Sequence, residues 1–213
     1  MDELDKLKNH WQKSEVAFPK VSEKEIYGML HKKSSSVVKW ILILSIAEFA
    51  FWLVLSFFLK DNPNTKRIES FHMDYVTIPL SVISYGIIIY FFYNFYKNYK
   101  KITATDNVKN LMANILKTRK TVSNYIFVNI IYVIICSVVL FAMYFYNDEQ
   151  LINAYHQSEA HGNVISFYIM YIIMAIVTIG ILILAVWLFY KLVYGFLLKR
   201  LYRNYEELKK IDF

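Results

Sequence analysis

The sequence has one cysteine, three prolines and five glycines among its 213 residues. Because Cys136 is alone, no disulfide can form within the chain, and its position in an apolar run predicts a small packing residue. The glycines form no G-x-x-x-G spacing, the pattern that lets two membrane helices approach closely. The sequence also contains no P-loop, no G-x-S-x-G and no metalloprotease helix motif, so no enzymatic activity is indicated by a motif.

Four long apolar runs dominate the sequence. Each reaches the roughly 20 residues that a helix needs to cross about 30 Å of hydrocarbon. The runs cover about residues 37–59, 75–96, 125–146 and 164–190. We therefore predict an all-α fold, a four-helix transmembrane bundle with amphipathic helices on its cytoplasmic side. The predicted division is a helical arm over 1–36, the membrane bundle over 37–198 and a tail over 199–213.

Lysine and arginine are distributed unevenly around these runs. Seven precede residue 37, three lie between the first and second runs, seven between the second and third, none between the third and fourth, and six follow Phe189. Because cytoplasmic segments carry the excess of basic residues, both termini are predicted to be cytoplasmic. This orientation and the attraction of anionic lipid account for the net charge of +7, so no nucleic-acid partner is expected.

The location follows from similar arguments. The first run begins only after the charged arm and lacks a small-residue cleavage site, so we expect it to remain as a membrane helix rather than a signal peptide. Heavy use of Lys, Asn, Ile, Phe and Tyr with little Gly and Pro is typical of AT-rich bacterial genomes. The predicted location is therefore a bacterial inner membrane.

The N-terminal arm carries an apolar stripe in a charged background. Leu4, Leu7 and Trp11 recur at helical spacing, which makes them candidates for binding a partner. A second helix is expected to start at Ser22, because Ser22 and Glu25 match a capping box.

The segment between the second and third runs predicts a further amphipathic helix over about 104–120. Its apolar stripe comprises Val108, Leu111, Met112, Ile115 and Leu116. Two interpretations stay open: a helix lying on the inner leaflet, or an extension that packs against the ends of the second and fourth runs.

Glu48 is the only charged residue deep inside a run. Counted from Val37 at 1.5 Å per residue, it lies about 16 Å along the span, near the bilayer midplane. A charged carboxyl there costs about 2.5 kcal/mol or more on insertion scales, so we expect Glu48 to face the bundle interior.

Several hydroxyl side chains are expected near Glu48. Antiparallel threading of the four runs brings the following to a similar level, with the first of them one turn away on the same helix: Ser45, Ser84, Tyr85, Ser137 and Thr178. Two interpretations of this polar site stay open. It is either a proton-titrating or cation-sensing site, or a hydrogen bond between helices that contributes about 1 kcal/mol.

The stretch between the third and fourth runs contains acids and histidines but no lysine or arginine. The spacing His156-x-x-Glu159-x-His161 matches neither zincin pattern of adjacent Glu and His. We predict a solvated acidic loop, no metal site and no cofactor.

The charged arm with Trp11, the stretches Phe18–Ser22 and Met29–Ser34, and the four runs that follow resemble an uncharacterised family of flavobacterial-type membrane proteins. The resemblance covers most of the chain. It implies a four-span membrane fold and carries no catalytic or binding residue to this sequence.

Three functional hypotheses follow. The first is a non-enzymatic membrane protein that presents a cytoplasmic helical surface to a protein partner or regulates it. The second is a transporter or channel subunit that associates with copies of itself and uses Glu48 as a titrating carboxyl, which requires a hydrated cavity reaching Glu48. The third is a membrane enzyme, which requires an acid, a base and a nucleophile to converge. The expected partners are the lipid bilayer, a cytoplasmic protein and further copies of the chain.

Overall fold

The computed structural model describes residues 22–105 and 107–210, and within these ranges the chain forms six helices and no strand. Four helices are long and apolar enough to cross a membrane: α2 (Glu23–Leu59), α4 (Asp74–Thr103), α5 (Val108–Asn147) and α7 (Val164–Lys209). Two shorter helices, α3 (Pro63–Glu69) and α6 (Glu149–Ala160), lie in the connections. The all-α class predicted from four apolar runs is confirmed.

Polar residues define where the helices begin. Glu25 donates its backbone N–H to Ser22 Oγ (3.3 Å), and the Ser22 backbone N–H donates to Glu25 Oε2 (2.9 Å), so the capping box predicted at the start of α2 is present. Asn62 caps α3, and Asp148 caps α6. The connection from α2 to α4 and the connection from α5 to α7 therefore each contain a helix, because a capping side chain precedes each segment. The second of these was predicted as a solvated acidic loop.

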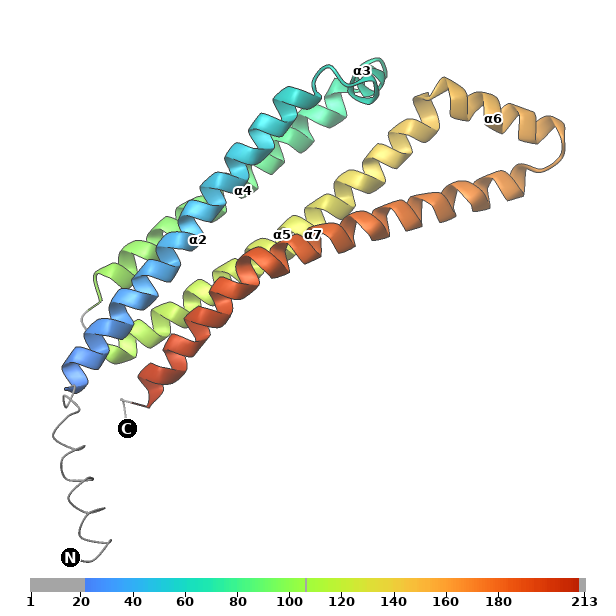
Figure 1. Ribbon diagram of the computed structural model, residues 1–213. Helices are drawn as coiled ribbons and strands as arrows, with labels where there is room; N and C mark the ends of the chain where they lie inside the picture. The colour runs from blue at the N-terminus through green and yellow to red at the C-terminus, as the bar shows by residue number, and fades with distance from the viewer. Residues whose placement is uncertain (1–21, 106, 211–213) are drawn as a thin grey trace, which may run out of the picture.

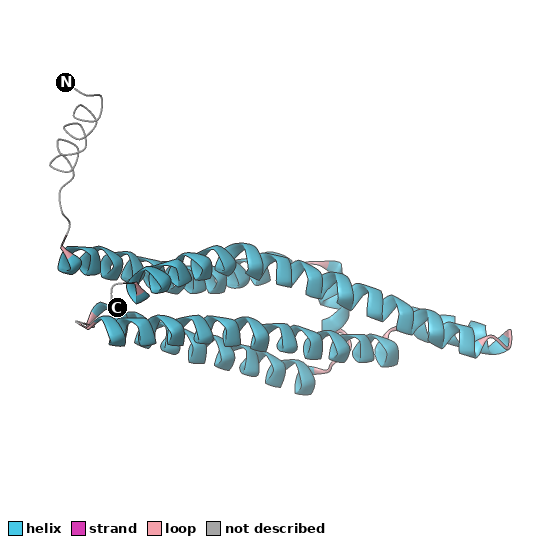
Figure 2. Ribbon diagram, turned by 90° about the horizontal axis from the view of Figure 1, so that it is seen from below, coloured by secondary structure: helices cyan, strands magenta, loops and turns pink. Residues whose placement is uncertain are grey.

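The long helices form two hairpins, α2 with α4 through α3 and α5 with α7 through α6, that run lengthwise side by side (Figures 1 and 2). We call the half in which α2 and α5 begin and α4 and α7 end the basal half. We call the half that carries α3 and α6 the loop half. The hairpins lie together in the basal half and diverge towards the loop half (Figure 1). This divergence determines where buried side chains and open space are found.

The apolar core lies in the basal half. Val38, Ile102, Ile115 and Leu201, one from each long helix, have no exposed surface. In the loop half most apolar side chains of the spans point outwards, and Ile176 of α7 is 65% exposed. Such a surface suits hydrocarbon rather than water, whereas the basal core resembles that of a soluble helical bundle.

The segment predicted as a separate helix over about 104–120 forms the first turns of α5. Helix α5 is continuous from its N-cap at Asn107 into the third span. Leu111 and Ile115 are fully buried, Val108 and Met112 pack against the same core, and only Leu116 is substantially exposed. The structure therefore has the packed extension, the second of the two interpretations, and not a helix lying on a lipid surface.

The described parts of the predicted arm and tail are continuous with the first and fourth spans. Helix α2 runs without a break from Glu23 through the serines at 34–36, and α7 extends to Lys209. Leu30 and Leu208, outside the predicted spans, are buried in the basal core. Leu4, Leu7 and Trp11 lie outside the described residues.

Candidate functional site: a cleft that ends at Glu48

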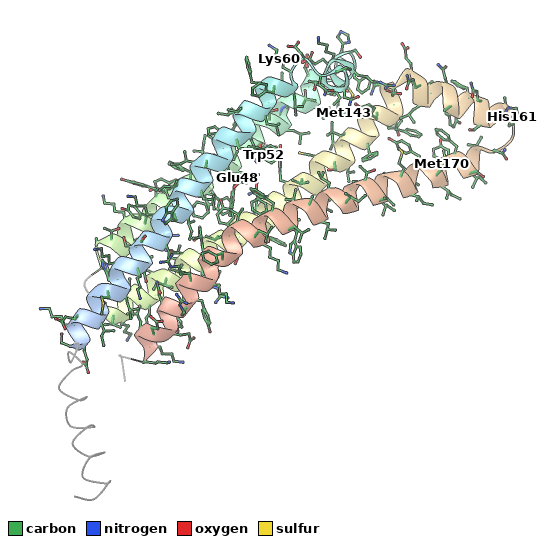
Figure 3. All side chains as sticks on the ribbon, in the orientation of Figure 1. Glu48, Trp52, Lys60, Met143, His161 and Met170 are labelled. Carbon is green, nitrogen blue, oxygen red and sulfur yellow. The ribbon has the colours of Figure 1, made fainter. Side chains whose placement is uncertain are left out.

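Glu48 is held inside the bundle by two tyrosines of α7. The Tyr190 hydroxyl donates to Glu48 Oε1 at 2.7 Å, and the Tyr194 hydroxyl donates to Glu48 Oε2 at 3.0 Å. Residues four apart share one face of a helix, so both hydroxyls approach the carboxyl from the same side. The Glu48 side chain is only 8% exposed. It lies close to Trp52, about midway along the structure (Figure 3).

A cluster of aromatic rings supports these tyrosines. Tyr125 of α5 packs edge to face against Tyr190 and at a similar angle against Tyr194, with both ring centroids 5.9 Å away. Phe91 and Phe95 of α4 pack against Tyr125, at 5.2 and 5.5 Å. All four long helices thus contribute either the carboxyl or a ring. We call Phe91, Phe95, Tyr125, Tyr190 and Tyr194 the aromatic cluster.

The carboxyl has hydroxyl partners but no cationic partner in the described ranges. Glu48 forms no ion pair with any described lysine, arginine or histidine. The nearby Ser45 hydroxyl donates to the backbone carbonyl of Leu42 and so gives no hydrogen bond to the acid. Each carboxyl oxygen therefore accepts one hydrogen bond, from Tyr190 and from Tyr194.

A cleft of about 450 Å³ opens from Glu48 towards the loop half. Its volume lies within the range of about 300–1,000 Å³ that is typical of small-molecule sites. The side chains that give its walls hydrogen-bonding groups come from α2, α4 and α5: Ser45, Ser56, Ser81, Ser84, Tyr85, Asn129 and Tyr132. Trp52 and Tyr85 are about half exposed, whereas Glu48 is nearly buried, so the carboxyl lies deep in the cleft and these rings lie near its opening.

The two hairpins contact each other again at the end of the loop half. The Arg67 Nε of α3 forms an ion pair with Asp148 Oδ2, at the junction of α5 and α6. Asp148 is buried and also caps α6 through its other oxygen, which accepts from the backbone N–H of Leu151 at 3.0 Å. Phe71 packs edge to face against Tyr144 at 5.2 Å beside this pair. We call the Arg67–Asp148 pair the loop-end ion pair.

The structure divides the side chains that the sequence grouped with Glu48. Ser45, Ser84 and Tyr85 line the cleft with it. Ser137 and Thr178 instead line a second, mainly apolar pocket of about 400 Å³ between α5, α6 and α7. The six-residue polar site expected from threading therefore does not form as one site.

The cause is the register of α7. Threading placed Thr178 level with Glu48, whereas the residue that reaches Glu48 is Tyr190, twelve positions or about 18 Å further along a helix. Helix α7 has 46 residues and is longer than a bilayer requires, so depth counted from Val164 was wrong. The spacing of Tyr190 and Tyr194, four residues apart on one helix face, was the available signal in the sequence.

The acidic stretch between the third and fourth spans forms α6. His156 Nδ1 lies 3.4 Å from Glu159 Oε2, and both side chains are exposed. His161 follows at the far end of the helix, well away from Glu48 (Figure 3). No group of three metal-ligating side chains forms within 22–105 and 107–210.

These features are those of a helical membrane protein with four helices long and apolar enough to span a bilayer and, among them, a cleft that holds one acid. The chain belongs to the family described as a domain of unknown function, DUF8845, whose model matches residues 24–213. Searches of the curated proteins and of the solved structures found no match.

Proposed function

We propose that this chain is a subunit of a transporter or channel in which Glu48 takes up and releases a proton or a small cation. The observation that carries the proposal is the cleft, because a carboxyl that only links two helices needs no open space beside it. Glu48 lies at the deep end of that space, beneath walls that carry several hydroxyl groups. An acid inside a membrane bundle that faces a polar cavity is a common feature of proton and ion pathways.

Access to Glu48 is one-sided. Below the carboxyl, Val37, Val38 and Ile41 of α2 are almost completely buried, and Leu201 of α7 packs in the same core. This apolar layer separates Glu48 from the base, so exchange would take place through the loop half. Transport across the membrane would then require the basal half to open in a second conformation.

Proton flux into liposomes tests this proposal. The purified full chain is reconstituted with a pH-sensitive dye inside the vesicles, and a pH gradient is imposed. We expect the wild type to dissipate the gradient faster than empty liposomes and Glu48→Gln to abolish the difference. Glu69→Gln, which changes an exposed acid of α3, is the matched control and should behave as wild type. Wild-type vesicles as tight as empty ones would contradict a proton pathway.

Binding of a cytoplasmic protein partner is the second candidate. Of its two proposed surfaces, the stripe over residues 108–116 packs mostly within the chain's own core, which leaves the arm. Leu4, Leu7 and Trp11 would form the contact, because they recur at helical spacing. Full-length protein should retain a partner in a pull-down that a variant with all three changed to Ser loses. Equal recovery by both proteins would argue against the arm.

We also propose that the chain lies in a bacterial inner membrane with both termini in the cytoplasm. The basic residues at the basal end support two cytoplasmic termini in a bacterial inner membrane, and the composition supports a bacterial, flavobacterial-type source. Green fluorescent protein fused after Phe213 should be fluorescent, and alkaline phosphatase inserted after Gly162 should be active. The reverse pair of results would invert the orientation.

A further inference from the structure

The number of acids in the cleft and its volume distinguish between organic cations and metal ions as ligands. Its one acid is Glu48, and no lysine, arginine or histidine lines it in the described part of the chain. A site with a single negative charge suits a ligand with a single positive charge. The space of about 450 Å³ is far larger than a bare metal ion, which also prefers several oxygen ligands closing around it. The cleft therefore fits an organic cation better than an inorganic one.

Aromatic rings surround the path to the carboxyl. Phe49 and Tyr85 meet edge to face across α2 and α4 with centroids 6.4 Å apart, and Trp52 lies one turn beyond Glu48 on α2. Tyr125 and Tyr190 form the deep end beside the acid. The faces of Trp and Tyr rings attract cations, and they also bury apolar groups.

The opening of the cleft is also lined by aromatic rings and flanked by apolar helix surfaces. Trp52 is 52% and Tyr85 48% exposed, and both belong to helices whose outer surfaces are long and apolar. A ligand that reaches this opening from the side must itself be soluble in hydrocarbon. A permanently charged but lipophilic cation meets both requirements.

We propose that the cleft binds lipophilic organic cations, with the positive centre beside the Glu48 carboxylate and the apolar substituents between the rings of Trp52 and Tyr85. When Glu48 is protonated beforehand, binding releases that proton to water, one proton for each cation bound. The proposal rests on the proposed exchange at Glu48 and names the ligand class for that exchange.

The titratable groups facing Glu48 make the expected pH dependence simple. They are Tyr125 from α5 and Tyr190 and Tyr194 from α7, with Tyr85 of α4 and Tyr132 of α5 on the cleft wall. A phenol is uncharged at neutral pH. Glu48 is then the group whose charge changes, so affinity for a cation should fall as the pH is lowered and Glu48 becomes protonated.

Two probes of nearly equal shape and opposite charge test the proposal. Tetraphenylphosphonium and tetraphenylborate are titrated by calorimetry into the purified full-length protein in detergent, in two buffers of different ionisation enthalpy. We expect the cation to bind with proton release and the anion to bind at least about tenfold more weakly, since only the cation is attracted to the carboxylate. Equal binding of the two probes would overturn the proposal.

Variants locate the binding. Glu48→Gln should lower the affinity for the cation at least about tenfold. Trp52→Leu should lower it about threefold to thirtyfold through loss of a cation–π contact. Trp187→Leu, which removes a ring that lies under Lys191 and outside the cleft, should leave the affinity unchanged. The pH dependence of the wild type supplies a test without any variant, and affinity that stays constant as pH falls contradicts the role of Glu48.

The two proposals fail differently. Proton flux that depends on Glu48, together with no binding of tetraphenylphosphonium, would reject the ligand class and leave the exchange at Glu48 standing. Tetraphenylphosphonium binding that is unaffected by Glu48→Gln and releases no proton would reject the site proposed for the cation.

Discussion

The two halves of this bundle differ in what holds them together. In the basal half, all four long helices share one apolar core, and side chains such as Val38 and Leu201 have no exposed surface. In the loop half the hairpins diverge, leave a cleft, and meet again through a few contacts around the loop-end ion pair. The difference indicates that stability comes mainly from the base, whereas the loop half provides open space beside a polar group.

Glu48 lies at the boundary of the two halves. The aromatic cluster, which is part of the basal core, packs on one side of the Glu48 carboxyl, and the cleft opens on the other side. A carboxyl at such a boundary is fixed in position by a rigid base yet reachable from open space. This combination suits a site that binds and releases, because the protein need not unpack its core to admit a ligand.

The largest effect on stability is expected from the basal core. Leu201→Ala should lower the free energy of unfolding by about 2–5 kcal/mol, because it removes a fully buried side chain and leaves a cavity. Leu184→Ala makes the same chemical change on α7 in the loop half, where the side chain is 55% exposed, and should cost much less. Thermal unfolding in detergent compares the two variants. Equal losses would remove the distinction between the halves.

The loop-end ion pair should rank second. Asp148→Asn leaves Arg67 without its partner while keeping an oxygen to cap α6. We expect a loss of about 1–3 kcal/mol, less than for a completely buried pair, because the Arg67 side chain is 36% exposed.

The exposed pair between Lys66 and Asp61 is the matched control. Its atoms lie 3.4 Å apart on the surface of the same loop half, and Asp61→Asn should cost about 0–1 kcal/mol. Both variants are compared by urea unfolding. A loss for Asp148→Asn no larger than for the control would mean that this pair does not hold the hairpins together.

A smaller effect is expected at the carboxyl itself. Tyr194→Phe removes one of two hydroxyl donors from Glu48 and should cost about 1–2 kcal/mol, because a buried acceptor loses a partner. Tyr96→Phe, on the half-exposed surface of α4, should have no measurable effect. Midpoints of thermal unfolding report both. A neutral Tyr194→Phe would show that its hydrogen bond contributes little.

The smallest change in stability, and the sharpest test of access, comes from single cysteines. In a Cys136→Ser background, Ser84→Cys should react with a water-soluble thiol reagent, because residue 84 lines the cleft. Ser34→Cys should stay unmodified, because residue 34 is fully buried and bonded to Asn204 in the basal half. Mass spectrometry measures the modified fraction. Protection of both positions would mean that water does not enter the cleft.

Much of the fold could be read from the sequence, because a bilayer demands helices of about 20 apolar residues and the four runs supply them. The spacing of Leu111 and Ile115 likewise identified a helical apolar face. It did not reveal what that face covers, because a stripe that packs on lipid and one that packs on protein have the same period.

The hydrogen-bond partners of Glu48 could not be predicted from the periodicity of the sequence either. Pairing between distant helices depends on their relative register, and α7 is long enough to slide by several turns without exposing a polar face. The predicted fourth span ended at residue 190, so Tyr190 and Tyr194 were expected at the membrane surface and not beside Glu48. The loop-end ion pair was hidden similarly, because Arg67 and Asp148 lie in connections whose helices, α3 and α6, were not predicted.

We propose that Glu48 exchanges its proton with water through the cleft. Infrared difference spectroscopy of the full-length protein between neutral and acidic pH tests it directly, since a protonated carboxyl has a carbonyl band that an ionised one lacks. We predict that a carboxylic acid band appears on acidification in the wild type and is absent from Glu48→Gln. A wild-type difference spectrum identical to that of Glu48→Gln would contradict the claim and leave Glu48 as a structural link between α2 and α7.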